Sequence, residues 1–135
     1  MKELTLRATV GNIPRVTAFI DELLEQAGCS VKAQMQIDVA IDELFGNVAH
    51  YAYSGAAGDA TVRFAFDSAA RAVTITFIDS GVPFNPLARE APDITLPAER
   101  RAVGGLGIFL VRKTMDRVDY QRRDGMNILT ITKTI

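Results

Sequence analysis

The sequence predicts an α+β fold: a two-layer sandwich in which three helices cover one face of a mostly antiparallel mixed sheet. Three observations predict it. Short segments alternate apolar and polar residues, which is typical of half-buried strands, and three longer segments repeat apolar residues at helical spacing. Consecutive strands are joined by short turns, which favours antiparallel pairing. The resulting order is β-α-α-β-β-loop-α-β-β, and 135 residues are expected to form a single domain, 1–135.

The N-terminal part of the chain is expected to form one strand and two helices. Residues 4–8 alternate apolar and polar side chains, as a half-buried strand does. Asn12 is the expected cap of the first helix, and Gly28 its end. A second helix is expected from about 31 to 53, and the small residues at 54–58 form a turn.

The rest of the chain is expected to form two hairpins with a long loop and a helix between them. The hairpins pair residues 61–66 with 72–78, and 117–122 with 128–134. Residues 80–103 contain four of the five prolines and form the long loop. A loop of this length inside a compact domain is usually functional. The third helix begins near Gly105.

Composition excludes several classes of protein. The 15 basic and 16 acidic residues nearly cancel, which argues against a direct nucleic-acid partner. One cysteine, Cys29, allows no intrachain disulfide, and no Cys/His cluster has zinc-like spacing. The charged N-terminal segment is not a signal peptide, and no apolar run is long enough to span a bilayer. We therefore expect a soluble cytoplasmic protein without a membrane partner.

The second expected helix carries a polar stripe. Glu43 and Asn47 are four residues apart and His50 is three further on, so their side chains stack along one side. A carboxylate beside an amide oxygen suits Mg²⁺, which takes few protein oxygens and leaves its other positions to phosphates and water. The alternative is a solvated helix face, because such residues are normally exposed.

A carboxylate extends the apolar row of the strand expected at 72–78. Asp79 has the same parity as the apolar residues before it, so it is expected to be buried and to need a hydrogen-bond donor. The exocyclic amine of a purine is one possible donor. Gly81 follows, where a ligand ring or a backbone could approach closely. The alternative is that Asp79 caps the Asp-Ser-Gly turn.

A glycine run leads into the third expected helix. Gly104, Gly105, Leu106 and Gly107 precede Ile108. Glycines at a helix start leave backbone N–H groups to face an anion, which the helix dipole also favours. The run is not a Walker A loop, because no Gly-Lys-Ser/Thr occurs, and its spacing does not fit the dinucleotide fingerprint.

Together these segments resemble the motifs of the GHKL ATPase superfamily, which includes histidine kinases, gyrase-type ATPases and anti-sigma factor serine kinases. Residues 43–53 resemble its helix motif, 79–84 its adenine-side motif and 104–108 its phosphate-side motif, in matching order and spacing. The His-Tyr-Ala-Tyr extension at 50–53 and the short length are most similar to the anti-sigma factor serine/threonine kinase branch. The resemblance covers essentially the whole chain and implies the histidine-kinase-like ATPase fold.

The resemblance implies a role for individual residues. Asn47 would coordinate Mg²⁺ that bridges the phosphates of ATP, and Glu43 would act as general base or orient the attacking hydroxyl. Asp79 would accept a hydrogen bond from the adenine amine, and Gly81 would make room for the ring. The other implied nucleotide contacts are His50, Gly104, Gly105, Leu106 and Gly107.

Further expectations concern the long loop and the chain's two ends. The resemblance makes residues 85–103 a lid over ATP, and by position Arg100 or Arg101 could reach the γ-phosphate. Arg15 stands where these proteins carry an arginine for partner contacts, although this part of the match is looser. Many members have Gly-Thr in the last hairpin. This chain departs from that pattern, since Gly125 is followed by Met126 and Asn127, and Asn127 could replace the hydroxyl as a polar nucleotide contact.

The resemblance implies an ATP-dependent serine/threonine protein kinase that is also an anti-sigma factor. It would phosphorylate an anti-anti-sigma antagonist protein, sequester a sigma factor and form a homodimer. One alternative is a catalytically silent ATP-binding module that regulates a partner by protein contact only. Another is a sensor histidine kinase domain, which needs a phosphoacceptor histidine on a dimerisation helix, whereas the only histidine is His50 within the nucleotide motif.

Overall fold

A computed structural model of the protein describes residues 1–88 and 105–135. The elements follow the predicted order. The strands are β1 (Lys2–Arg7), β2 (Asp59–Asp67), β3 (Ala72–Asp79), β4 (Arg117–Arg123) and β5 (Met126–Thr134). The helices are α1 (Ile13–Gln26), α2 (Val31–Asn47) and α3 (Gly105–Thr114). Three short helical turns complete the described structure: Val10–Asn12, Val48–Ala52 and Pro86–Ala88.

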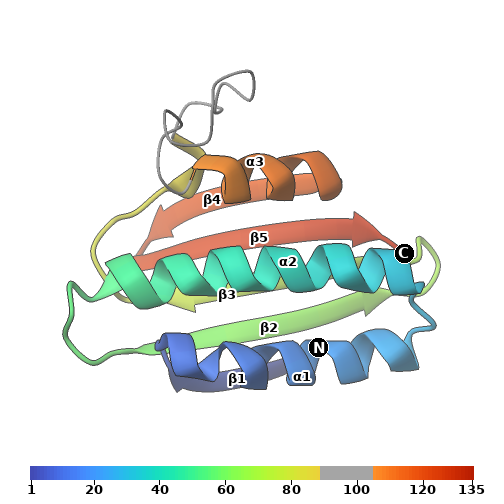
Figure 1. Cartoon of the computed structure of the whole chain (residues 1–135), viewed down its shortest axis with the longest axis horizontal. Coiled ribbons are helices and arrows are strands. Elements are labelled where there is room, and N and C mark those ends of the chain that lie inside the picture. Colours follow the sequence, from blue (N-terminus) through green and yellow to red (C-terminus); the bar gives the residue numbers. More distant parts are fainter. Residues whose placement is uncertain (89–104) are drawn as a thin grey trace.

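The five strands form one sheet in the order β1-β2-β3-β5-β4. Each pair of neighbours is antiparallel, so the described part of the sheet has no parallel pair of the kind a mixed sheet would contain. All three helices lie over the same face, with α1 over β1 and β2, α2 over the centre and α3 over β4 (Figure 1). The predicted α+β class and two-layer arrangement are confirmed.

The core lies between the sheet and the helices, where the apolar periodicities of the two layers meet. In β3, every second residue from Val73 onward is buried, and the last member of this row is Asp79. Helix α1 buries residues four apart, namely Val16, Ile20 and Leu24. Helix α2 packs between α1 and α3 and buries Ile37, Ile41, Leu44 and Phe45. A carboxylate therefore sits at the edge of an apolar core.

The second helix departs from the prediction at its C-terminal end. The sequence predicts one helix to Tyr53, but α2 ends at Asn47 and continues as a π-helical turn over Val48–Ala52. The wider turn changes the angle between successive residues, so His50 leaves the line of Glu43 and Asn47 and is exposed. Single π-helical turns at the end of α-helices often mark functional sites.

The entries to α1 and α2 differ. Asn12 is the N-cap residue of α1, as predicted, but its side chain makes no capping bond: its Nδ2 donates to the Arg7 carbonyl at 2.8 Å, and a 3₁₀ turn leads into the helix. Ser30 caps α2, because its hydroxyl accepts from Ala33 N at 3.2 Å.

Within residues 1–88 and 105–135, no helix combines the length and apolar character that a membrane crossing requires.

Candidate functional site

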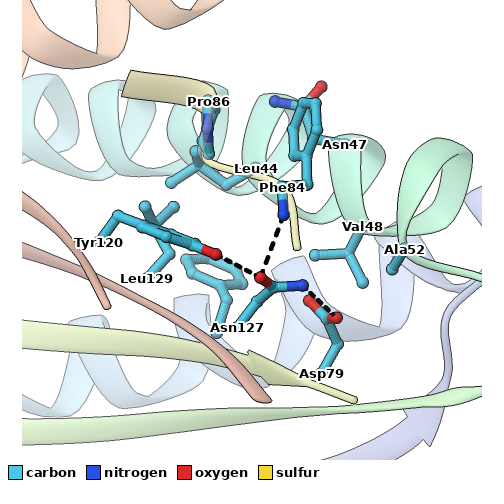
Figure 2. Close-up of a pocket in the computed structure, with 11 residues that line it drawn as sticks. Leu44, Asn47, Val48, Ala52, Asp79, Phe84, Pro86, Tyr120, Asn127 and Leu129 are labelled. Carbon is cyan, nitrogen blue, oxygen red and sulfur yellow. Dashed lines mark hydrogen bonds between the residues drawn. The ribbon is translucent and has the colours of Figure 1, made fainter. Parts of the chain in front are cut away.

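A small cavity of about 30 Å³ lies where α2, the π-helical turn and the ends of three strands meet (Figure 2). Its walls are mainly apolar, with a few polar groups that converge from different elements, which is typical of small-molecule sites. The lining residues are Leu44, Asn47, Val48, Ala52, Phe77, Asp79, Phe84, Pro86, Tyr120, Asn127 and Leu129. The cavity therefore brings together Asn47 and Asp79, which the sequence singles out, and Asn127, which belongs to the segment that departs from the Gly-Thr pattern.

Asp79 ends β3 and is only 5% exposed. Its Oδ1 accepts from Gly81 N and from Asn127 Nδ2, both at 2.9 Å. The bond from Gly81 is the turn-capping contact that the sequence offered as an alternative. No described residue donates to the second oxygen, Oδ2. Asp79 therefore caps the turn with one oxygen and keeps an acceptor for a ligand with the other.

The close approach expected at Gly81 is to protein backbone. A β-carbon at this position would collide with the carbonyl group of Ala52, the last residue of the π-helical turn. The next residue, Val82, donates its N–H to the same carbonyl at 2.7 Å. Gly81 therefore lets the turn after β3 dock on the end of the second helix. Room for a ligand ring at this residue stays a prediction.

Two further residues, which the sequence did not single out for this purpose, hold the turn after Asp79. The Tyr53 hydroxyl accepts from Ser80 N at 3.0 Å and donates to the Asp59 carbonyl at 2.5 Å. Arg122 of β4 donates from Nη1 to the Gly81 carbonyl at 2.7 Å. These contacts join segments far apart in sequence, so local periodicity carries no signal for them. The backbone beside Asp79 is therefore fixed from several sides.

Asn127 is buried and uses its complete hydrogen-bonding capacity inside the protein (Figure 2). Its Nδ2 donates to Asp79 Oδ1 at 2.9 Å and to the Val82 carbonyl at 2.8 Å. Its Oδ1 accepts from Phe84 N at 3.2 Å and from the Tyr120 hydroxyl at 2.5 Å. An amide has two donor hydrogens and two acceptor lone pairs, so none is left over for a ligand. This geometry favours an indirect role for Asn127 over the direct nucleotide contact predicted from the sequence.

A second meeting point lies where α2 passes the start of α3. The carboxylate of Glu43 lies against Gly107, and a β-carbon at position 107 would overlap it. Helix α3 begins at Gly105, as the sequence predicts. The polar stripe of α2 and the glycine-led helix are thus brought together, although they are far apart in the chain.

The remaining site predictions are not all placed at this cavity. His50 and Arg15 are exposed, on the π-helical turn and on α1, and neither lines the cavity. Gly104, Arg101 and most of the expected lid at 85–103 lie outside the described residues, and only the backbone of Leu106 is described.

Metal binding at this site would rest on few protein ligands. No group of three or more His, Cys, Asp or Glu side chains that could hold a metal occurs within the described ranges. Asn47 lines the cavity, and an amide oxygen is a ligand that Mg²⁺ accepts when phosphates and water fill its other positions. The residues present thus fit a cation that arrives with a phosphate ligand.

The chain also matches a known protein family. A family model described as the histidine kinase-like ATPase domain matches residues 6–133. The chain belongs to this family. A histidine kinase domain from the blue-light activated histidine kinase of Erythrobacter litoralis superposes with a TM-score of 0.58 at 15% identity, covering 93% of this chain and 60% of that one. At that identity the likeness shows the fold alone.

Curated relatives carry the names of serine kinases. The serine/threonine-protein kinase BtrW of Bordetella bronchiseptica is 27% identical over 103 residues, covering 76% of this chain and 72% of BtrW. A serine-protein kinase RsbW of Bacillus cereus is 33% identical over 101 residues, which is 72% of this chain but only 61% of that protein. Another Bacillus cereus RsbW aligns over 134 residues at 27% identity. The family model confirms the superfamily that the sequence motifs resemble, and the names of these relatives agree with its serine kinase branch.

Proposed function

We propose that this protein is an ATP-dependent serine/threonine protein kinase and an anti-sigma factor. One observation carries the proposal: α2 presents Asn47 to the cavity that contains Asp79, and one turn earlier presents Glu43 to the start of α3. The proposed metal ligand and general base thus lie one turn apart on α2, between the carboxylate at the end of β3 and the start of α3. Membership of the ATPase family and relatives named as serine kinases support the same conclusion.

At the base end, Asp79 is the residue that reads adenine. Its Oδ2 would accept a hydrogen bond from the 6-amino group, while Leu44, Phe77 and Leu129 provide apolar walls for the ring. The present cavity of about 30 Å³ holds only a water molecule or two, whereas ligand pockets span roughly 300–1,000 Å³. Phe84 lies in the segment that follows the fixed turn, so we infer that its ring moves outward when the base enters.

At the phosphate end, the residues provide positioning and neutralise charge. Asn47 would hold Mg²⁺, and backbone amides at Gly105 and Gly107 would contact the phosphates at the start of α3. ATP with Mg²⁺ would supply the phosphoryl group that is transferred. Glu43 would orient the incoming serine hydroxyl and accept its proton. Phosphoryl transfer requires little more from a protein than such placement and electrostatic stabilisation.

The partners in this proposal are two proteins and a second copy of the chain. The kinase substrate is an anti-anti-sigma antagonist, the sequestered partner is a sigma factor, and Arg15 on the exposed face of α1 contributes to partner binding. The chain acts as one ATP-binding kinase domain, 1–135, and as a homodimer. Arg101 and the lid at 85–103 belong to the same proposal.

The nucleotide site is tested by calorimetry. Wild type is titrated with ATP with and without Mg²⁺, alongside Asp79→Ala and the exposed α2 variant Asp42→Ala as a matched control. We expect magnesium-dependent binding by wild type and Asp42→Ala, and loss of binding in Asp79→Ala. If the wild type does not bind ATP, the kinase proposal fails for this chain.

The transfer reaction is tested separately, since binding alone would also suit a silent module. Labelled γ-phosphate is followed from ATP to a serine-bearing antagonist with wild type, Glu43→Ala and Asp42→Ala. A kinase predicts transfer by wild type and Asp42→Ala and little by Glu43→Ala. A catalytically silent module, which regulates its partner by contact only, predicts no transfer by any of the three.

A further inference from the structure

The orientation of the Asn127 amide is dictated by groups that can act only in one way. The backbone N–H of Phe84 can only donate, so the atom it meets must be Oδ1, and the Val82 carbonyl can only accept, so it meets Nδ2. With the amide so oriented, Nδ2 must donate its other hydrogen to Asp79. The Tyr120 hydroxyl then donates into Oδ1 and completes its second acceptor position.

This chain of hydrogen bonds determines how Asp79 faces the cavity. Asp79 Oδ1 already receives two donors, from Gly81 N and from Asn127 Nδ2. The plane of the carboxylate is therefore held, and Oδ2 is the oxygen left to meet a ligand. Tyr120, Asn127 and Asp79 all line the same cavity, so this chain of hydrogen bonds ends at the carboxylate that would meet the ligand.

We propose that Asn127 and Tyr120 are positioning residues that make this cavity select a 6-aminopurine over a 6-oxopurine. A fixed carboxylate oxygen accepts from an amino group but repels a carbonyl oxygen at the same place. If Asp79 could rotate, it could turn away from the 6-oxo group and part of the discrimination would be lost. The inference rests on the proposed function, because it concerns the base end of that ATP site.

The test compares three nucleotides that differ only at the base. ATP, GTP and purine riboside triphosphate, which has no group at position 6, are titrated with Mg²⁺ against wild type and variants. Asn127→Leu keeps the branching and the number of heavy atoms of the side chain and removes all four bonds, while Tyr120→Phe removes only the hydroxyl. Thr130→Val, on β5 but on the other face of the sheet from Asn127, serves as the matched control.

Asn127→Leu is expected to weaken ATP roughly tenfold to a hundredfold, the value of a hydrogen bond to a charged group, and to change the 6-unsubstituted analogue far less. Tyr120→Phe is expected to lower the ratio of the affinity for ATP to that for the analogue by a smaller factor. Thr130→Val is expected to leave this ratio unchanged. A purely structural role would instead weaken all three nucleotides equally. Without nucleotide, amide hydrogen exchange at Gly81, Val82 and Phe84 is expected to accelerate in both site variants.

The outcomes separate the two proposals. If wild type binds ATP and both variants keep its preference for ATP over GTP and the analogue, the positioning role is overturned and the kinase proposal stands. If wild type binds no nucleotide, the proposed function is overturned, and the inference with it. Circular dichroism establishes folding. Should Asn127→Leu fail to fold, Tyr120→Phe decides: a lowered ratio supports the inference and an unchanged ratio overturns it.

Discussion

The carboxylate of Glu43 occupies the space that a side chain at position 107 would need. Glycine at this position therefore leaves room for the Glu43 carboxylate, in addition to any contact with phosphate. The relationship ties the proposed general base to the start of the helix that would hold the phosphates. A substitution at either residue should change the position of the other.

The first prediction is that Gly107→Ala separates catalysis from folding. The new β-carbon would displace Glu43, so we expect phosphoryl transfer to fall at least about tenfold, as for loss of a positioned general base. The helix itself should tolerate alanine, which is better by about 1 kcal/mol in a helix interior. Transfer rate and thermal midpoint are measured together. Gly46→Ala is the control, because a β-carbon at position 46 would lie 4.0 Å from Ile13 Cδ1, which is an ordinary van der Waals distance. Equal transfer rates in the two variants would contradict the prediction.

The second prediction concerns stability at the turn after β3. Gly81→Ala would drive a β-carbon into the Ala52 carbonyl and break the bond from Val82 N. We expect the free energy of unfolding to fall by about 1–3 kcal/mol, the usual cost of overpacking. Urea denaturation measures it. Gly11→Ala, whose nearest neighbour is Thr9 Oγ1 at 4.0 Å, should change stability by much less. A cost no larger than that of the control would show that the turn yields easily.

Much of the fold could be predicted because its periodicities are regular. The strands expected at 61–66 and 72–78 appear as Asp59–Asp67 and Ala72–Asp79, since alternation there follows burial closely. The π-helical turn could not be predicted, because a helical pattern in sequence does not distinguish a 3.6-residue turn from a wider one. The place of His50 relative to Glu43 and Asn47 could not be predicted for the same reason.

The site was predictable by residue type but not by contact. Asp79, Gly81 and Gly107 are conspicuous in sequence, yet nothing local reveals that the glycines meet Ala52 and Glu43. Hairpin register carries a further signal in the sequence. The tight turn after Arg123 pairs Arg123 with Met126 and thereby places the β4 side chains beside Asn127. Long-range hydrogen bonds such as that from Arg122 to Gly81 need the assembled fold.

The third prediction concerns access to the cavity. Phe84 lines it and stacks on Tyr51, with ring centroids 4.9 Å apart. If this ring must move before the base enters, Phe84→Ala should raise the association rate of ATP, because the binding-competent state becomes more populated. Stopped-flow binding measures the rate. Val82→Ala is the control, since Val82 belongs to the same segment but is 49% exposed and does not line the cavity. An unchanged or slower rate would show that Phe84 is no barrier.

A pair of carboxyl groups joins α1 to α2 away from the cavity. Asp21 and Asp38 interact by a side-chain hydrogen bond, and Oδ1 of each is buried without another partner in the described structure. Burial, the side-chain hydrogen bond with Asp21 and the negative charge of Asp21, in that order, together raise the pKa of Asp38 to about 7. One proton shared between the two groups accounts for both observations.

The fourth prediction follows from the sign of that shift. The folded protein holds a proton on Asp38 that the unfolded chain releases near its ordinary pKa of 3.8. The stabilisation is therefore complete below about pH 4 and is lost as pH rises through about 7. Asp38→Asn keeps a donor for Asp21 and does not titrate, so it should flatten this dependence. We expect it to be more stable than wild type at pH 8 by about 1 kcal/mol, allowing for solvent screening.

Urea unfolding of wild type, Asp38→Asn and the exposed α2 variant Asp42→Asn at pH 5 and pH 8 makes the comparison. Only the Asp38 variant should gain stability relative to wild type between the two pH values, because Asp42 is exposed on the same helix. If the difference between Asp38→Asn and wild type is the same at both pH values, the two carboxyl groups share no proton. Their buried oxygens would then require another donor, since an unpaired buried acceptor is costly. The pH dependence therefore decides whether a shared proton stabilises the packing of α1 against α2. Helix α1 carries Arg15, and α2 carries Glu43 and Asn47 of the proposed active site.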